Sequence, residues 1–145
     1  MFGWLDYLLY LCGKIIRMKK ILTCFLAVLG LNSACGQQNF ENADVVAFAE
    51  LVADSNVVVL DVRTAGEYAE GHIEGSVNID QGQSDFMDKA RAALSPSKKI
   101  AVYCRSGRRS ANAAGRLADI GYLCVNLKGG IIAWKEAGKP VSPKE

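Results

Sequence analysis

Two short, continuous apolar runs constrain the fold of this chain more than any other feature. They are residues 57–60 (VVVL) and 100–103 (IAVY). Both are too short for a buried helix and are rich in β-branched or aromatic side chains, so they are typical of strands buried on both faces. Such strands occur in parallel sheets whose two faces are covered by helices. The pattern therefore predicts an α/β domain.

The rest of the chain alternates between strand and helix patterns. Further strands are predicted over residues 77–79 and 123–127, and helices over residues 44–54, 67–70, 85–94, 109–120 and 131–137. Asn42 is the predicted N-cap of the first helix. The alternation indicates a mostly parallel sheet with helices on both faces. In such folds the reactive groups lie beyond the carboxyl ends of the strands, which directs attention to Asp61 and Cys104.

The front of the chain has the layout of an export signal. A basic start at residues 17–20 is followed by an apolar core at 21–31 and then by small residues, and the core falls within the usual range of about 7–15 residues. This predicts a signal peptide over residues 18–34, with Met18 as the initiator and residues 1–17 as a misassigned upstream extension. A double hydrophobic hairpin or an interrupted membrane anchor is the alternative.

Ser33 and Ala34 stand directly before Cys35 and resemble the lipobox of bacterial lipoproteins. The resemblance implies a lipid on Cys35, with residues 35–42 as a tether, residues 43–140 as the folded domain and residues 141–145 as a tail. The expected location is the cell envelope, where the lipid anchor holds the protein to a membrane, facing the periplasm or the exterior. A soluble periplasmic protein and retention in the cytoplasm are the alternatives.

Charge excludes one class of partner. The whole chain has a formal net charge of +2, but residues 35–145 carry 13 basic and 14 acidic side chains. A nearly neutral domain lacks the basic surface that nucleic-acid binding requires. We therefore expect no nucleic-acid partner.

Residues 104–110 (CRSGRRS) carry the clearest chemical signal. A cysteine ends a predicted strand, a short loop with one glycine and three arginines follows, and a helix then begins. Successive backbone N–H groups in such a loop form an anion-binding nest, to which the helix N-terminus adds positive charge. These groups favour the nucleophilic thiolate of Cys104. The segment predicts attack by Cys104 on an anionic group with a covalent intermediate on sulfur; a buried structural cysteine is the alternative.

Four segments together resemble the single-domain rhodaneses, which are thiosulfate sulfurtransferase-like proteins. They are residues 60–63 (LDVR), 67–79 (EYAEGHIEGSVNI), the 104–110 loop and 127–134 (LKGGIIAW). The resemblance implies a rhodanese-like three-layer α/β fold around a mostly parallel five-stranded sheet. It also implies a sulfurtransferase that moves a sulfane sulfur from an anionic, thiosulfate-like donor to a thiol or cyanide acceptor, through a persulfide on Cys104.

The resemblance implies roles for individual residues as well. The residues expected to bind the anionic donor are Arg105, Ser106, Gly107, Arg108, Arg109 and Ser110. Asp61 and Arg63 are expected to support the site, paired with Glu67 or Glu74 or capping the adjoining turn. His72 is the only histidine, so no metal site is expected, and no other cofactor is implied. A structural role for His72 is favoured over proton transfer.

Loop length separates two chemistries within this superfamily. Arg109 closes a loop of six residues counted from Cys104, as in the sulfur-transferring members, whereas related phosphatases and arsenate reductases have a loop one residue longer. A sulfane sulfur needs a tighter cradle than a phosphoryl group, so a phosphatase-like or arsenate-reductase-like enzyme is the less favoured alternative. The main alternative is a relay or binding module that passes its persulfide to a protein thiol.

Overall fold

The computed structural model describes residues 39–142 of the chain. The predicted upstream extension, the signal peptide, Cys35 with the first half of its tether, and the last three residues lie outside the described residues. Between residues 39 and 142, no helix is both long enough and apolar enough to cross a membrane.

A five-stranded sheet forms the centre of the domain. Its strands are β1 (Glu41–Ala43), β2 (Val57–Asp61), β3 (Val77–Asn78), β4 (Lys99–Tyr103) and β5 (Leu123–Leu127). Their order is β1-β5-β4-β2-β3, and every neighbouring pair is parallel. The apolar runs at residues 57–60 and 100–103 thus form the neighbouring inner strands β2 and β4. The predicted sheet is confirmed, and all of its pairings are parallel.

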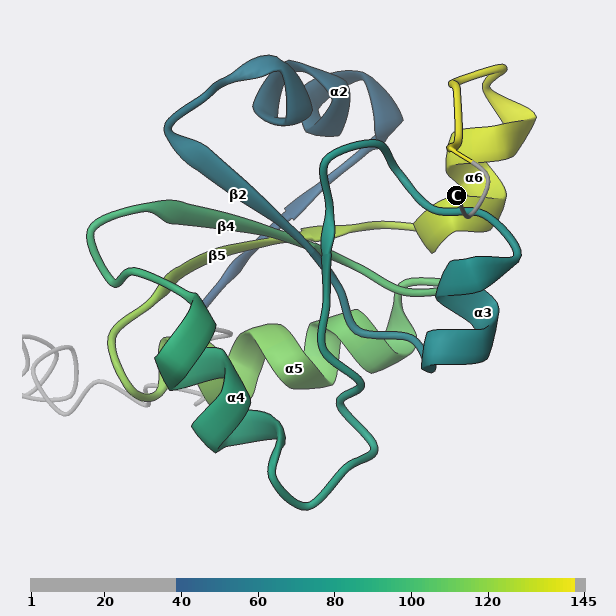
Figure 1. Ribbon diagram of the computed structural model, residues 1–145. Coiled ribbons are helices and arrows are strands. Elements are labelled where there is room, and N and C mark those ends of the chain that lie inside the picture. Colours follow the sequence, from purple (N-terminus) through teal and green to yellow (C-terminus); the bar gives the residue numbers. More distant parts are fainter. Residues whose placement is uncertain (1–38, 143–145) are drawn as a thin grey trace, which may run out of the picture. The chain divides into compact units, whose positions relative to one another are not determined.

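Helices cover both faces of this sheet, which confirms the three-layer α/β fold. They are α2 (Val45–Ala53), α3 (Ala65–Ala69), α4 (Phe86–Ala93), α5 (Arg108–Ala118) and α6 (Gly130–Glu136). Helices α4 and α5 lie on one side of the sheet, and α2 and α6 lie on the other (Figure 1). The loops at the carboxyl ends of β2, β4 and β5 run toward α3, α5 and α6.

The strand β1 differs from the sequence expectation. It includes Glu41 and Asn42, which the sequence pattern assigns to the tether, and pairs with the last residues of β5. It was not predicted because it is only three residues long and contains no apolar run. Its presence moves the helix cap: the carboxylate of Asp44, not Asn42, accepts the Ala47 N–H at 2.9 Å. The prediction of Asn42 as the N-cap is wrong because Asn42 belongs to the sheet.

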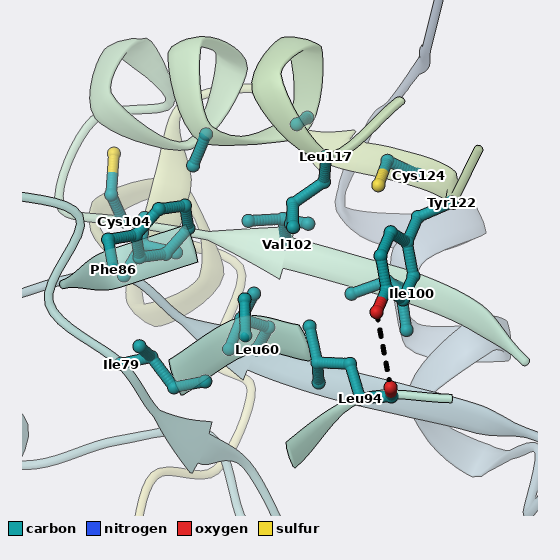
Figure 2. Packing of buried hydrophobic residues seen from close by; sticks show 14 residues of the cluster. Leu60, Ile79, Phe86, Leu94, Ile100, Val102, Cys104, Leu117, Tyr122 and Cys124 are labelled. Carbon is teal, nitrogen blue, oxygen red and sulfur yellow. Dashed lines mark hydrogen bonds between the residues drawn. The ribbon is translucent and has the colours of Figure 1, made fainter. Parts of the chain in front are cut away.

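Cys104 lies at the end of the core cluster between the sheet and helices α4 and α5. Figure 2 shows it beside Phe86, while Cys124 lies at the other end of the cluster beside Tyr122. The hydroxyl of Tyr122 donates to the carbonyl of Leu94 at 3.3 Å and so joins the residue before β5 to the C-cap of α4. The sulfur of Cys104 is therefore fixed by a closely packed core rather than carried on a free loop.

Candidate active site

The backbone after β4 folds around the sulfur of Cys104. The residue is only 1% exposed, and its Sγ accepts from the Gly107 N–H at 3.2 Å and lies 3.3 Å from the Ser110 hydroxyl. Burial alone raises the pKa of this thiol, but hydrogen bonds from Ser110 and from the backbone amides of Ser106 and Gly107 outweigh burial and lower the pKa of Cys104 below its ordinary value. The loop is thus a nest that favours the thiolate.

Cys124 shows what burial does without such a nest. It packs in the same core cluster and is 4% exposed. Burial raises the pKa of Cys124 to about 12, and burial is the only cause. Both thiols between residues 39 and 142 are free, yet their pKa values move in opposite directions. The difference arises from the hydrogen bonds around Cys104, so Cys104 is the one of these two thiols whose surroundings favour the thiolate.

The first residues of α6 bond to the backbone carbonyls of the Cys104 loop. The N–H of Ile131 donates to the carbonyl of Cys104 at 2.8 Å, and the N–H of Ile132 donates to the carbonyl of Arg105 at 3.2 Å. This contact depends on Gly130, where an added Cβ would meet the carbonyl oxygen of Cys104 and lie 2.6 Å from that of Arg105. Gly129 and Gly130 both have positive φ values, so the turn into α6 requires glycine, and the close approach adds a second reason for glycine at Gly130.

The three arginines of the loop lie in different surroundings. Arg109 is partly buried, and its guanidinium donates to both carboxylate oxygens of Glu67, at 2.8 and 2.6 Å. Hydrogen bonds and charge from Glu67, together with a smaller contribution from Cys104, raise the pKa of Arg109. The side chains of Arg105 and Arg108 are exposed to solvent, as is Ser106. Arg109 therefore lies between an acidic partner and the sulfur, while the other two arginines face outward.

Glu67 was not identified as a site residue from the sequence. It is the N3 residue of α3 and forms a capping box with Thr64, in which each side chain bonds to the other's backbone N–H. This cap fixes the carboxylate at the start of α3, from where it reaches Arg109. The hydrogen bond from Arg109 lowers the pKa of Glu67 to about 2. The capping-box spacing of Thr64 and Glu67 was the available signal, because it predicts the position of the carboxylate.

Asp61 and Arg63 pair with each other, which corrects the predicted pairing with Glu67 or Glu74. The Arg63 guanidinium donates to Asp61 at 2.6 Å and to the carbonyl of Gly71 at 2.8 Å. The side chains are 0% and 5% exposed. Residues two apart in an extended segment point to the same side, which was the available signal for this pair. The pair joins the end of β2 to the segment that follows α3, so it supports the framework next to the loop.

A chain of polar side chains runs from the sulfur to the edge of the sheet. Ser110 is fully buried and lies 2.6 Å from Oδ1 of Asn126, whose Nδ2 donates to Oδ1 of Asn42 at 2.8 Å. Asn126 was not singled out from the sequence. Its signal was a polar residue inside the otherwise apolar strand of residues 123–127. It lies two residues after Cys124 and therefore on the same face of β5.

His72 is held by local contacts. Its ring stacks on Tyr68 with centroids 3.8 Å apart, and its Nδ1 lies 3.1 Å from the carbonyl of Tyr68. Its backbone forms both hydrogen bonds of a bridge to Ser142, so a residue of the predicted tail packs against it. These contacts favour the structural role over proton transfer.

Comparison with known proteins agrees with this geometry. The family model described as Rhodanese-like domain matches residues 44–137. The chain is 33% identical over 112 residues to thiosulfate sulfurtransferase 18 of Arabidopsis thaliana, covering 69% of this chain and 82% of that protein. It is 32% identical to a sulfurtransferase of Allochromatium vinosum, covering 70% and 94%. The crystal structure of a rhodanese-related protein from Thermoplasma volcanium matches with a TM-score of 0.64 and 35% identity, covering 71% and 98%. The matched residues include every strand but β1 and all of the helices described here, and the chain therefore belongs to the rhodanese-like domain family.

Proposed function

We propose that this protein is a sulfurtransferase that carries a sulfane sulfur as a persulfide on Cys104. The observation that carries the proposal is the nest around Cys104 Sγ, which lowers the pKa of a buried thiol while burial raises that of Cys124. The names of the two curated relatives support the same reaction class.

The reaction balances with thiosulfate as donor and needs no further reagent. The Cys104 thiolate attacks the outer sulfur of thiosulfate, a bond forms between the two sulfurs, and the sulfur–sulfur bond of the donor breaks as sulfite leaves with its electron pair. The terminal sulfur of the resulting persulfide carries the negative charge, which the loop amides stabilise. An acceptor thiolate or cyanide then attacks that terminal sulfur and returns Cys104 as the thiolate.

The small size of the cradle favours sulfur over phosphoryl transfer. In a loop one residue longer, the arginine that binds phosphate would fall on the position of Ser110. Here Ser110 is buried and bonded to Cys104 and Asn126, so this position contributes a hydroxyl to the sulfur rather than a guanidinium to a tetrahedral anion. The exposed Arg105 and Arg108 remain available to attract a dianionic donor at the mouth of the loop.

Intact mass measurement tests the proposal. Thiosulfate treatment should add about 32 Da, the mass of one sulfur atom bound covalently to the nucleophile, and cyanide should remove it. Cys104→Ser should stay unmodified, since a hydroxyl cannot form a persulfide, whereas the control Cys124→Ser should gain the sulfur. Wild-type protein that gains no mass, or a Cys104→Ser variant that does, would contradict the proposal.

We also propose that Cys35 carries a lipid that holds the domain at a bacterial membrane, outside the cytoplasm. The basic, apolar and small residues of 17–34 in that order support this, with Cys35 immediately after them. A single lipid chain with a short tether localises a protein without a spanning helix, although stable anchoring requires a second chain or contact. In cell fractionation the native protein should partition with membranes and Cys35→Ala should not. Native protein that is soluble in the cytoplasm and begins at Met1 would overturn this assignment.

A further inference from the structure

The buried hydroxyl of Ser110 faces three acceptors and has one proton. Its Oγ lies 3.3 Å from Cys104 Sγ, 3.1 Å from the carbonyl of Gly107 and 2.6 Å from Oδ1 of Asn126. A hydroxyl donates one hydrogen bond at a time. The direction of this proton therefore decides whether the sulfur receives a hydrogen bond from Ser110.

Two of these acceptors compete for the proton. The carbonyl of Gly107 already accepts the first hydrogen bond of α5, from the Ala111 N–H at 3.1 Å, so it has the least need of a second donor. Asn126 and Cys104 remain. Asn126 is 3% exposed and lies between Ser110 and Asn42. An amide presents an acceptor at one end and a donor at the other, and half a turn about its last torsion exchanges them.

We propose that Asn126 is a positioning residue that directs the proton of Ser110 toward or away from Cys104 Sγ. When the amide oxygen faces Ser110, the hydroxyl donates to Asn126 and the sulfur receives nothing from it, which suits a neutral sulfur. When the amide nitrogen faces Ser110, Asn126 donates to Oγ and the Ser110 proton points at Sγ, which suits a thiolate. The amide of Asn42, on the edge strand β1, turns in step so that donor again meets acceptor.

The hydrogen-bonded side chains of Ser110, Asn126 and Asn42, called the relay from here on, respond to the charge on the sulfur. A thiolate at Cys104 places its charge on Sγ and draws the Ser110 proton. A persulfide places the charge on the outer sulfur, so Sγ needs the hydrogen bond less and the hydroxyl can return to Asn126. The inference rests on the proposed role of Cys104 as nucleophile, but it concerns only the hydrogen bonds to Sγ.

The pH dependence of Cys104 alkylation by iodoacetamide tests the relay without requiring any sulfur transfer. Peptide mass spectrometry resolves Cys104 from the other cysteines of the purified protein. Asn126→Asp keeps the shape of the side chain but offers only acceptors, which hold the Ser110 proton away from Sγ, so it should raise the apparent pKa of Cys104. Asn126→Leu removes the acceptor that competes with Sγ, so it should lower the pKa. The loss of one hydrogen bond corresponds to a thiolate fraction that is about 3- to 10-fold lower at a pH below the pKa.

A double-variant cycle separates the relay from a general disturbance of β5. Ser110→Ala should raise the pKa, and adding Asn126→Leu to Ser110→Ala should leave the pKa where Ser110→Ala puts it, because no hydroxyl proton remains to be directed. Cys124→Ala is the matched control, since it shortens a buried side chain on the same face of the same strand and should leave the pKa of Cys104 unchanged. An unchanged or lower pKa in Asn126→Asp, an unchanged or higher pKa in Asn126→Leu, full additivity with Ser110→Ala, or an equal shift in the control would overturn the inference.

Different results would contradict the proposed function and the proposed role of Asn126. Wild-type protein that forms no persulfide contradicts the proposed function, while the alkylation profiles still report the relay. Conversely, normal persulfide formation with Asn126 variants that alkylate as wild type contradicts only the relay.

Discussion

Arg109 and Glu67 face each other across 42 residues of sequence and are joined by two hydrogen bonds of 2.8 and 2.6 Å. Glu67 is fixed by the cap of α3, and Arg109 lies in the first turn of α5. The pair therefore connects the segment after β2 to the Cys104 loop. The carboxylate of Glu67 also compensates the charge of Arg109, which interacts with Cys104, so the field that an incoming anion meets depends on Glu67 as well as on the loop.

Glu67→Gln should make the loop more attractive to thiosulfate. The substitution keeps the shape of the side chain but removes the negative charge that Arg109 now faces. With a partly exposed group and solvent screening, we expect a KM for thiosulfate about 2- to 5-fold lower at low salt, with the difference shrinking at high salt. Steady-state kinetics with cyanide as acceptor measure it. Glu74→Gln, which removes an exposed carboxylate nearby in the sequence, should change little, and a higher KM for Glu67→Gln would contradict this account.

The same pair predicts a pH dependence of stability. Arg109 lowers the pKa of Glu67 from its ordinary 4.5 to about 2, so the folded state binds its proton less readily than the unfolded state. The stabilisation is therefore fully present above pH ~4.5 and is lost as the pH falls toward about 2. Urea unfolding should show wild type more stable than Glu67→Gln at pH 6, by a small amount because the pair is partly exposed. The two should converge near pH 2, and a gap that persists there would exclude Glu67 as its source.

Arg105→Ala should weaken the use of an anionic donor without affecting the nest. Arg105 is exposed, and its backbone carbonyl, which the substitution leaves in place, is the group that bonds to α6. A charge-assisted hydrogen bond to the donor is worth about 1.5–3 kcal/mol, or roughly 10- to 150-fold in kcat/KM. Arg91→Ala is the control, since Arg91 pairs with Asp88 on α4. The pKa of Cys104 should stay unchanged in Arg105→Ala, which would show that the nest is intact. Unchanged thiosulfate kinetics in Arg105→Ala would exclude this residue from the donor site.

Asp61→Asn should destabilise the fold strongly. Asp61 is fully buried and is the partner of a buried guanidinium that also bonds to Gly71. Removing one charge of a buried pair leaves the other uncompensated, which costs about 3–5 kcal/mol in the free energy of unfolding. The matched control is Asp88→Asn, whose pair with Arg91 is exposed and should contribute under about 1 kcal/mol. Equal losses in urea unfolding would show that burial of the pair is not the reason.

The sequence predicted the framework of the fold because strand burial leaves a local pattern. Residues 57–60 and 100–103 are apolar without interruption, and they became the inner strands β2 and β4. The short edge strand β1 was missed because an edge strand of three residues needs no apolar run. Its partner, β5, lies more than 80 residues later in the chain, and a pairing of this kind leaves no local signal.

The residues of the candidate site also fall into two groups, those that a local sequence pattern predicts and those that it does not. The Cys104 loop could be predicted because its cysteine, glycine and arginines are consecutive, and the nest is made by backbone groups of that same segment. Glu67 and Asn126 could not be assigned from the sequence, because each acts through a partner from a distant segment, Arg109 and Ser110 respectively. Their positions depend on which helix and strand ends the topology brings together. Local patterns predict the elements but not these contacts.

Gly130→Ala should displace the Cys104 loop, and Gly138→Ala provides the matched control. Both glycines have a left-handed backbone, with φ of +60° and +69°, so alanine strains both by about 1–2 kcal/mol. Only at Gly130 would the new Cβ meet backbone atoms, those of Cys104 and Arg105, whereas it meets nothing within 4 Å at Gly138. The backbone of the loop cannot rotate aside as a flexible side chain does, so the loop or the start of α6 has to move.

Displacement of a reacting group by about 1 Å costs on the order of 100-fold in rate, and we expect a loss of at least tenfold in the rate of persulfide formation for Gly130→Ala. Gly138→Ala should lose a similar amount of stability from backbone strain yet form the persulfide at the wild-type rate. Mass spectrometry of the thiosulfate reaction over time and urea unfolding of both variants measure the two effects. Equal rates in the two variants would show that the contact between α6 and the loop does not position the sulfur.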